Sequence, residues 1–210
     1  EDAYVVKVDA CGNWQWSKVY GGALDERTSS ATQTSDGGFM LVNYSSSFTS
    51  GNWDFQLIKT DNLGNVQWQS SYGSPGADYP RAGIETSDGG FLIGGVTNGV
   101  GSGANDYVVF KVDGNGALQW TRTYGNGAND FLNDLDLTPD GGFIMSGYRR
   151  NYTAGREGYV IKADSLGNVL WAREIFGVGN ENMRGTTILA NGNYLICLLY
   201  TSDAADDLWC

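Results

Sequence analysis

Acidic residues at a regular spacing are the side chains of this sequence with the clearest capacity for chemistry. Glu26, Asp78, Asp130 and Glu181 each stand just before a segment predicted to be a strand, at intervals of 52, 52 and 51 residues. If these strands line one channel, the carboxylates ring its mouth, and calcium takes about six to eight such oxygen ligands. The alternative is that each acid accepts N–H hydrogen bonds within its own turn. The recurrence favours the turn, because local structural needs recur with a repeat. Calcium is the one cofactor that the sequence suggests.

A second acidic set begins recurring Asp-Gly-Gly strings at Asp36, Asp88 and Asp140. An aspartate that bonds its own backbone, followed by glycine at positive φ, is typical of a tight turn between strands. Carboxylate catalysis needs two groups in unlike environments, whereas these three aspartates occupy equivalent positions. The sequence also contains no histidine, which is the commonest general base and metal ligand. We therefore expect structural turns here and no catalytic residue.

Ligand binding is expected where the repeats differ, because loops on a rigid scaffold carry most binding sites. The loop after each second predicted strand varies most, over 44–53, 97–105 and 148–157. Aromatic and hydrogen-bonding side chains suit a sugar ring or a peptide, and ordinary variation between loops is the alternative. The candidate ligand-binding residues are Tyr44, Phe48 and Trp53 in the first loop and Arg149, Arg150, Tyr152 and Arg156 in the third.

These candidates lie within a repeat of about 52 residues, in which the string Lys-x-Asp-x-x-Gly-x-x-x-Trp occurs four times. A period near 50 built from short strands is typical of a propeller, where each unit buries its faces only against its neighbours. We expect each repeat lysine to pair with the aspartate two residues later on the same strand face, as in Lys59 and Asp61. We also expect the fixed tryptophans to pack between units. They are Trp16, Trp68, Trp120 and Trp171.

Each repeat divides into four short segments bounded by Gly, Asp, Asn or Ser, and none shows a sustained helical period. We predict an all-β fold, a β-propeller of four-stranded antiparallel blades with essentially no helix. Half a blade spans 2–20, full blades span 25–72, 77–124 and 129–176, and half a blade spans 183–196, about four blade-equivalents in all. The chain is either a closed four-bladed ring or, as we expect, a piece of a larger ring.

The repeat resembles that of secreted bacterial β-propeller proteins, which combine Tyr-Gly-Gly, Thr-x-Asp-Gly-Gly-aromatic and a closing Asp-x-x-Gly-Asn-x-x-Trp. Residues 20–22, 34–39 and 54–68 match these motifs, and the resemblance covers 2–196. The repeat is also similar, though less closely, to the tryptophan-docking motif of quinoprotein propellers and to Kelch repeats. The resemblance implies an extracellular or cell-surface setting and a non-catalytic scaffold that binds glycan or protein. A fragment of a propeller enzyme, quinoprotein-like or a glycosidase, is the alternative.

Composition argues against two further classes of partner. At a net charge of −11 the surface repels phosphate backbones, so no nucleic acid is expected. No run of about 18 apolar residues is present, so no membrane span is expected. Residues 197–207 resemble a translated sequencing adapter, and we expect 197–210 to be a non-native tail. Cys11 then stands alone and forms no internal disulfide.

Overall fold

The computed structural model describes residues 1–48, 52–151, 155–176 and 180–200. Within these ranges the chain forms sixteen β-strands and no helix, which confirms the all-β prediction. Because these ranges contain no helix, none of their segments forms a helix that could cross a membrane. Strands that follow one another within a sheet pair antiparallel, and three of the sheets have four strands, as predicted.

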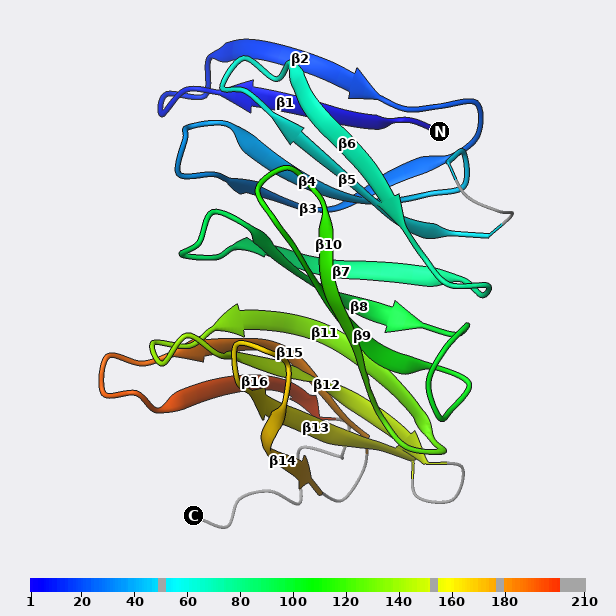
Figure 1. The fold of residues 1–210 in the computed structure, drawn as a ribbon. Coiled ribbons are helices and arrows are strands. Elements are labelled where there is room, and N and C mark those ends of the chain that lie inside the picture. The colour runs from blue at the N-terminus through cyan, green and yellow to red at the C-terminus, as the bar shows by residue number, and fades with distance from the viewer. Residues whose placement is uncertain (49–51, 152–154, 177–179, 201–210) are drawn as a thin grey trace.

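The sheets are numbered 1 to 5 in chain order (Figure 1). Sheet 1 consists of β1 (Ala3–Val8) and β2 (Trp14–Tyr20), and sheet 2 of β3 (Glu26–Gln33), β4 (Phe39–Ser45), β5 (Asp54–Thr60) and β6 (Val66–Tyr72). Sheet 3 consists of β7 (Asp78–Glu85), β8 (Phe91–Thr97), β9 (Asp106–Val112) and β10 (Leu118–Tyr124). Sheet 4 consists of β11 (Asn129–Leu137), β12 (Phe143–Asn151), β13 (Gly155–Ala163) and β14 (Val169–Ile175), and sheet 5 of β15 (Glu181–Ile188) and β16 (Tyr194–Tyr200).

The first four residues of the expected tail belong to a strand. Cys197 to Tyr200 continue β16, and Cys197 lies opposite Gly185 on β15. The rest of the expected tail, 201–210, lies outside the described residues.

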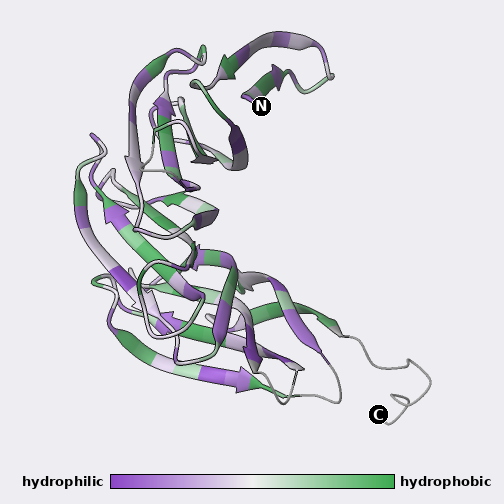
Figure 2. Ribbon diagram, turned by 90° about the vertical axis from the view of Figure 1, so that its right-hand side faces the viewer, coloured by the Kyte–Doolittle hydropathy of each residue, from purple (hydrophilic) through white to green (hydrophobic). Residues whose placement is uncertain are grey.

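The sheets are stacked in chain order, and Figure 2 shows that they follow an open arc. The first strands of neighbouring sheets, β3, β7, β11 and β15, contact one another in turn. Sheets 1 and 5 lie at opposite ends of the arc. The described residues therefore do not form the closed ring of a propeller.

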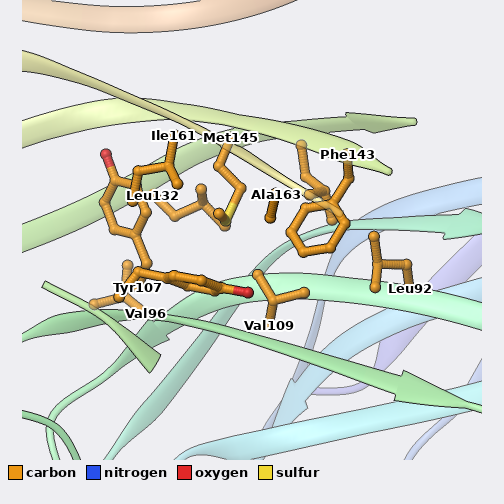
Figure 3. Close-up of a cluster of buried hydrophobic side chains, with 11 residues drawn as sticks. Leu92, Val96, Tyr107, Val109, Leu132, Phe143, Met145, Ile161 and Ala163 are labelled. Carbon is orange, nitrogen blue, oxygen red and sulfur yellow. The ribbon is translucent and has the colours of Figure 1, made fainter. Parts of the chain in front are cut away.

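The hydrophobic core lies between the stacked sheets. β8 and β9 are buried along their whole length, as expected for short apolar strands covered on both faces. The fourth strands, such as β6 and β10, are largely exposed or half-buried. Figure 3 shows the cluster between sheets 3 and 4, in which Leu92, Val96, Tyr107 and Val109 lie against Leu132, Phe143, Met145, Ile161 and Ala163.

Each repeat tryptophan lies on the last strand of one sheet and reaches the next sheet. The Trp68 indole N–H donates to the carbonyl oxygen of Gly114 at 2.9 Å. Its ring centroid lies 6.1 Å from that of Phe91 in a T-shaped arrangement. The other three tryptophans also lie against a ring of the next sheet: Trp16 edge-on to Phe39 at 5.7 Å, Trp120 stacked on Phe143 at 6.2 Å and Trp171 tilted against Tyr194 at 5.9 Å.

The repeat lysines find a different partner from the one expected. Lys59 Nζ lies 2.8 Å from Asp36 Oδ2, in the turn between β3 and β4. Asp61 instead accepts the backbone N–H groups of Leu63 and Asn65, each at 2.8 Å. The prediction of a Lys59–Asp61 pair was wrong because this aspartate closes its own turn. Equivalent pairs join Lys111 to Asp88 and Lys162 to Asp140, each at 3.0 Å.

Candidate ligand-binding face

One end of the sheets carries most of the candidate residues. At this end the first strands begin, the second strands end and the third strands begin, because consecutive strands are antiparallel. In sheet 2, Glu26 lies opposite Ser45, and Arg27 lies opposite Tyr44. The backbone N–H of Asp78 in sheet 3 donates to the carbonyl oxygen of Trp53 at 2.6 Å, which fixes the loop of sheet 2 against the next sheet. We call this end the binding face, after the candidate ligand-binding residues that it carries.

An aromatic–arginine cluster, formed by Arg27, Tyr44, Trp53 and Tyr79, lies on the binding face. The ring centroid of Tyr44 lies 5.1 Å from that of Trp53 and 6.3 Å from that of Tyr79. The Arg27 guanidinium lies 5.4 Å from the Trp53 ring centroid, within cation–π range. Phe48, in the same loop, is exposed. The sequence missed Arg27 and Tyr79, since they belong to strands and not to the variable loops.

A similar cluster recurs at equivalent positions of sheet 4. The rings of Phe131 and Tyr148 stack with centroids 4.9 Å apart, and the Arg156 guanidinium lies 4.9 Å from the Tyr148 ring centroid. Arg150 is exposed at the end of β12. Tyr152 lies outside the described residues.

Arg149 differs from the other basic candidates because it is an internal residue. It is only 7% exposed, and its Nε donates to Asp130 Oδ1 at 2.7 Å. The guanidinium also pairs with Glu174 and lies 4.0 Å from the Tyr159 ring centroid. These contacts occupy the guanidinium, so Arg149 is not available to an external ligand.

The four carboxylates considered for a calcium ring are buried on the binding face, each at or next to the start of a first strand. Three of them accept a backbone N–H from the loop before the strand: Glu26 from Gly22 at 2.6 Å, Asp78 from Ser74 at 2.6 Å and Asp130 from Asn126 at 3.2 Å. The part of the chain that the structure describes contains no group of three or more His, Cys, Asp or Glu side chains placed to hold a metal ion. The structure therefore does not bring Glu26, Asp78, Asp130 and Glu181 together.

A second acidic residue accompanies two of these carboxylates and was missed in the sequence. Asp54 and Asp106, the first residues of β5 and β9, are buried. The carboxyl groups of Asp54 and Asp78 lie within hydrogen-bonding reach, and burial, with the neighbouring Asp78, raises the pKa of Asp54 to about 6. Burial is the largest cause that raises the pKa of Asp130, and the charge of the nearby Asp106 raises it further. The signal in the sequence is a constant interval of 24 residues between the members of each pair.

A cavity of about 440 Å³ lies beside the first of these pairs, between sheets 2 and 3. Phe55, Tyr72 and Phe110 give it an apolar wall, and Ser74 and Asp78 line it as well. The amino-acid sequence matches no protein-family model and no curated protein. The geometry of the binding face is thus the basis on which a function is assigned.

Proposed function

We propose that this chain is a segment of a β-propeller from an extracellular or cell-surface protein, and that it binds glycan without catalysis at the binding face. Three features support the propeller. The sheets consist of consecutive antiparallel strands, their first strands adjoin one another, and a tryptophan fills each interface between sheets. These features are the ones expected of consecutive propeller blades, and they support the proposal.

The aromatic–arginine cluster is the observation that carries the glycan proposal. Trp53 and Tyr44 are half-buried; Tyr44 lies near the end of β4 and Trp53 directly precedes β5, so a ligand would meet aromatic surface that is already positioned. Aromatic rings offer apolar faces to the C–H groups of a sugar, and Tyr hydroxyl and Arg N–H groups can bond its hydroxyls. Arg27 is partly exposed and pairs through Nε with Glu1 Oε2 at 2.9 Å, so a sugar that bears a carboxylate would compete with Glu1 for this guanidinium.

The buried carboxylate pairs do not favour the glycosidase alternative. Glycoside hydrolysis uses two carboxyl groups about 5–5.5 Å or about 6.5–9.5 Å apart, with the sugar between them. Asp54 and Asp78 lie within hydrogen-bonding reach of each other and are buried, which leaves no room for a glycosidic bond. The pair also recurs as Asp106 and Asp130, as a structural feature of a repeat would.

A glycan array followed by titration calorimetry tests the proposal. Trp53→Ala should weaken binding of the selected glycan by at least about tenfold, or about 1.4 kcal/mol, since the ring supplies the central stacking surface. Trp14→Ala is the matched control, because Trp14 is 67% exposed on β2 at the opposite end of its sheet. Equal binding by Trp53→Ala and the parent protein would contradict the site. If the partner proves to be a protein, the ligand of the binding face is a protein and not a glycan.

A further inference from the structure

Two buried carboxylate pairs join neighbouring sheets, and their charges are balanced differently. The first pair is Asp54 of sheet 2 with Asp78 of sheet 3, and the second is Asp106 of sheet 3 with Asp130 of sheet 4. Buried carboxylates that adjoin each other repel, so both stay ionised only if a cation compensates them.

In the second pair the compensating charge belongs to the protein. Arg149 Nε donates to Asp130 Oδ1 at 2.7 Å, and both side chains are buried. Arg149 lies directly opposite Asp130 in the register of β11 and β12. A guanidinium thus stands beside this pair.

Beside the first pair, the position equivalent to Arg149 is occupied by a threonine, whose side chain carries a hydroxyl and no charge. Thr97 lies opposite Asp78 in the register of β7 and β8 and is completely buried. Its Oγ1 is 3.2 Å from Ser74 Oγ, which in turn donates to Asp78 Oδ2 at 2.9 Å. Among the described residues, no lysine or arginine forms an ion pair with Asp54 or Asp78.

One carboxylate oxygen of Asp54 accepts no hydrogen bond from the described residues. The residue is 7% exposed and Asp78 is 2% exposed. Asp54 Oδ1 is buried, and no described donor gives it a hydrogen bond; Asp106 Oδ1 of the second pair is in the same state. The backbone at Gly73 covers the carboxyl group so closely that a Cβ there would collide with Asp54, as a Cβ at Gly125 would collide with Asp106. The two pairs thus share an oxygen without a donor and differ in the neighbouring cation: Arg149 stands beside the second pair, and Thr97 takes its place beside the first.

We infer that Asp54 and Asp78 together bind one hard divalent cation of the calcium class between sheets 2 and 3. This cation would play the part that the Arg149 guanidinium plays beside Asp130 in sheet 4. Carboxylate oxygens from both residues are the charged ligands, and the hydroxyl oxygens of Ser74 and Thr97 are of the type that calcium accepts. The cavity lined by Ser74 and Asp78 gives the ion a route from solvent. The site differs from a ring of four carboxylates, because it uses one first-strand acid together with Asp54. It is independent of the glycan proposal.

Calcium titration of the full chain after EDTA treatment tests this inference. Calorimetry should give one calcium per chain. At a calcium concentration of 100 times the Kd, the melting temperature should rise by about 5–10 °C. Asp54→Asn should abolish both effects and still fold, because it removes one of two repelling charges. Thr97→Arg should also abolish calcium binding, since it supplies the internal cation of the neighbouring site.

Asp106→Asn is the matched control, and it should leave calcium binding unchanged because it alters only the pair that Arg149 compensates. Binding that survives Asp54→Asn, or that disappears in Asp106→Asn, would overturn the assignment. So would a parent protein that takes up no calcium.

Discussion

Replacing Gly116 by alanine tests whether the stacked sheets are held by their tryptophans. Gly116 has a φ of +83°, and a Cβ at this residue would lie 2.9, 3.0 and 3.2 Å from three ring atoms of Trp68. The indole cannot retreat freely, because its N–H is bonded to the carbonyl oxygen of Gly114 at 2.9 Å and its ring packs on Phe91. The substitution should therefore separate sheet 2 from sheet 3 or strain the turn.

The expected loss has two parts. A left-handed backbone costs alanine about 1–2 kcal/mol, and overpacking against the indole costs a further 1–3 kcal/mol or so. Gly89 supplies the control for the first part alone. It lies in the same sheet with a φ of +77°, and a Cβ there would meet no atom within 4 Å. Gly116→Ala should thus lose about 1–3 kcal/mol more than Gly89→Ala, which for a chain of this length lowers the melting temperature by a further 2–12 °C, roughly.

Urea unfolding followed by tryptophan fluorescence measures both free energies. A double-mutant cycle adds Trp68→Phe, which shortens the ring system. Trp68→Phe should relieve part of the loss in Gly116→Ala, while it should add independently to Gly89→Ala. If the two glycine variants lose the same free energy within about 0.5 kcal/mol, the contact between Trp68 and the turn contributes nothing and the reasoning fails.

Three further substitutions test the ion pairs and the core. Arg149→Met should lower the free energy of unfolding by about 3–5 kcal/mol, because its partner carboxylate is left buried without a cation; a loss below about 1 kcal/mol in urea unfolding would show that the pair is not structural. Trp120→Ala should cost about 3–5 kcal/mol, and melting within a degree of the parent would refute its packing role. Hydrogen bonds from Thr86 and Lys111 lower the pKa of Asp88 to about 2. Its folded pKa lies below the unfolded value, so this stabilisation is present above about pH 4 and is lost as the pH falls toward 2. The Asp88 carboxyl is more than half exposed, so the loss in the free energy of unfolding is at most about 1 kcal/mol. In Asp88→Asn this contribution to the pH dependence of the free energy of unfolding should be absent.

The sequence alone determined the strands and turns of this protein. Asp61 and Gly64 close a turn with their own neighbours, and the aspartate of Asp36-Gly37-Gly38 accepts the N–H of Gly38 at 3.0 Å. Such contacts join residues two to four positions apart, so residue type and spacing suffice to predict them. The alternation of apolar segments with these turns then fixes strand length and the antiparallel order. This is why the all-β prediction and the four-stranded sheets were confirmed.

The tertiary structure decided which of the repeated charges meet. Lys59 reaches Asp36 across the sheet, because Asp61 is occupied by its own turn. Arg149 lies in a variable loop of the sequence, yet the register of β12 against β11 buries it beside Asp130. Neither result follows from spacing along one strand.

The carboxylate pairs show most clearly that spacing along the chain does not predict which charges meet. The interval of 24 residues between Asp54 and Asp78 is present in the sequence, but it has no meaning until the third strand of one sheet adjoins the first strand of the next. That contact depends on how the buried faces of two sheets stack, a packing problem involving residues from both repeats. Local sequence thus determined what each repeat is, and the stacking of sheets decided where its charges are buried and what they require.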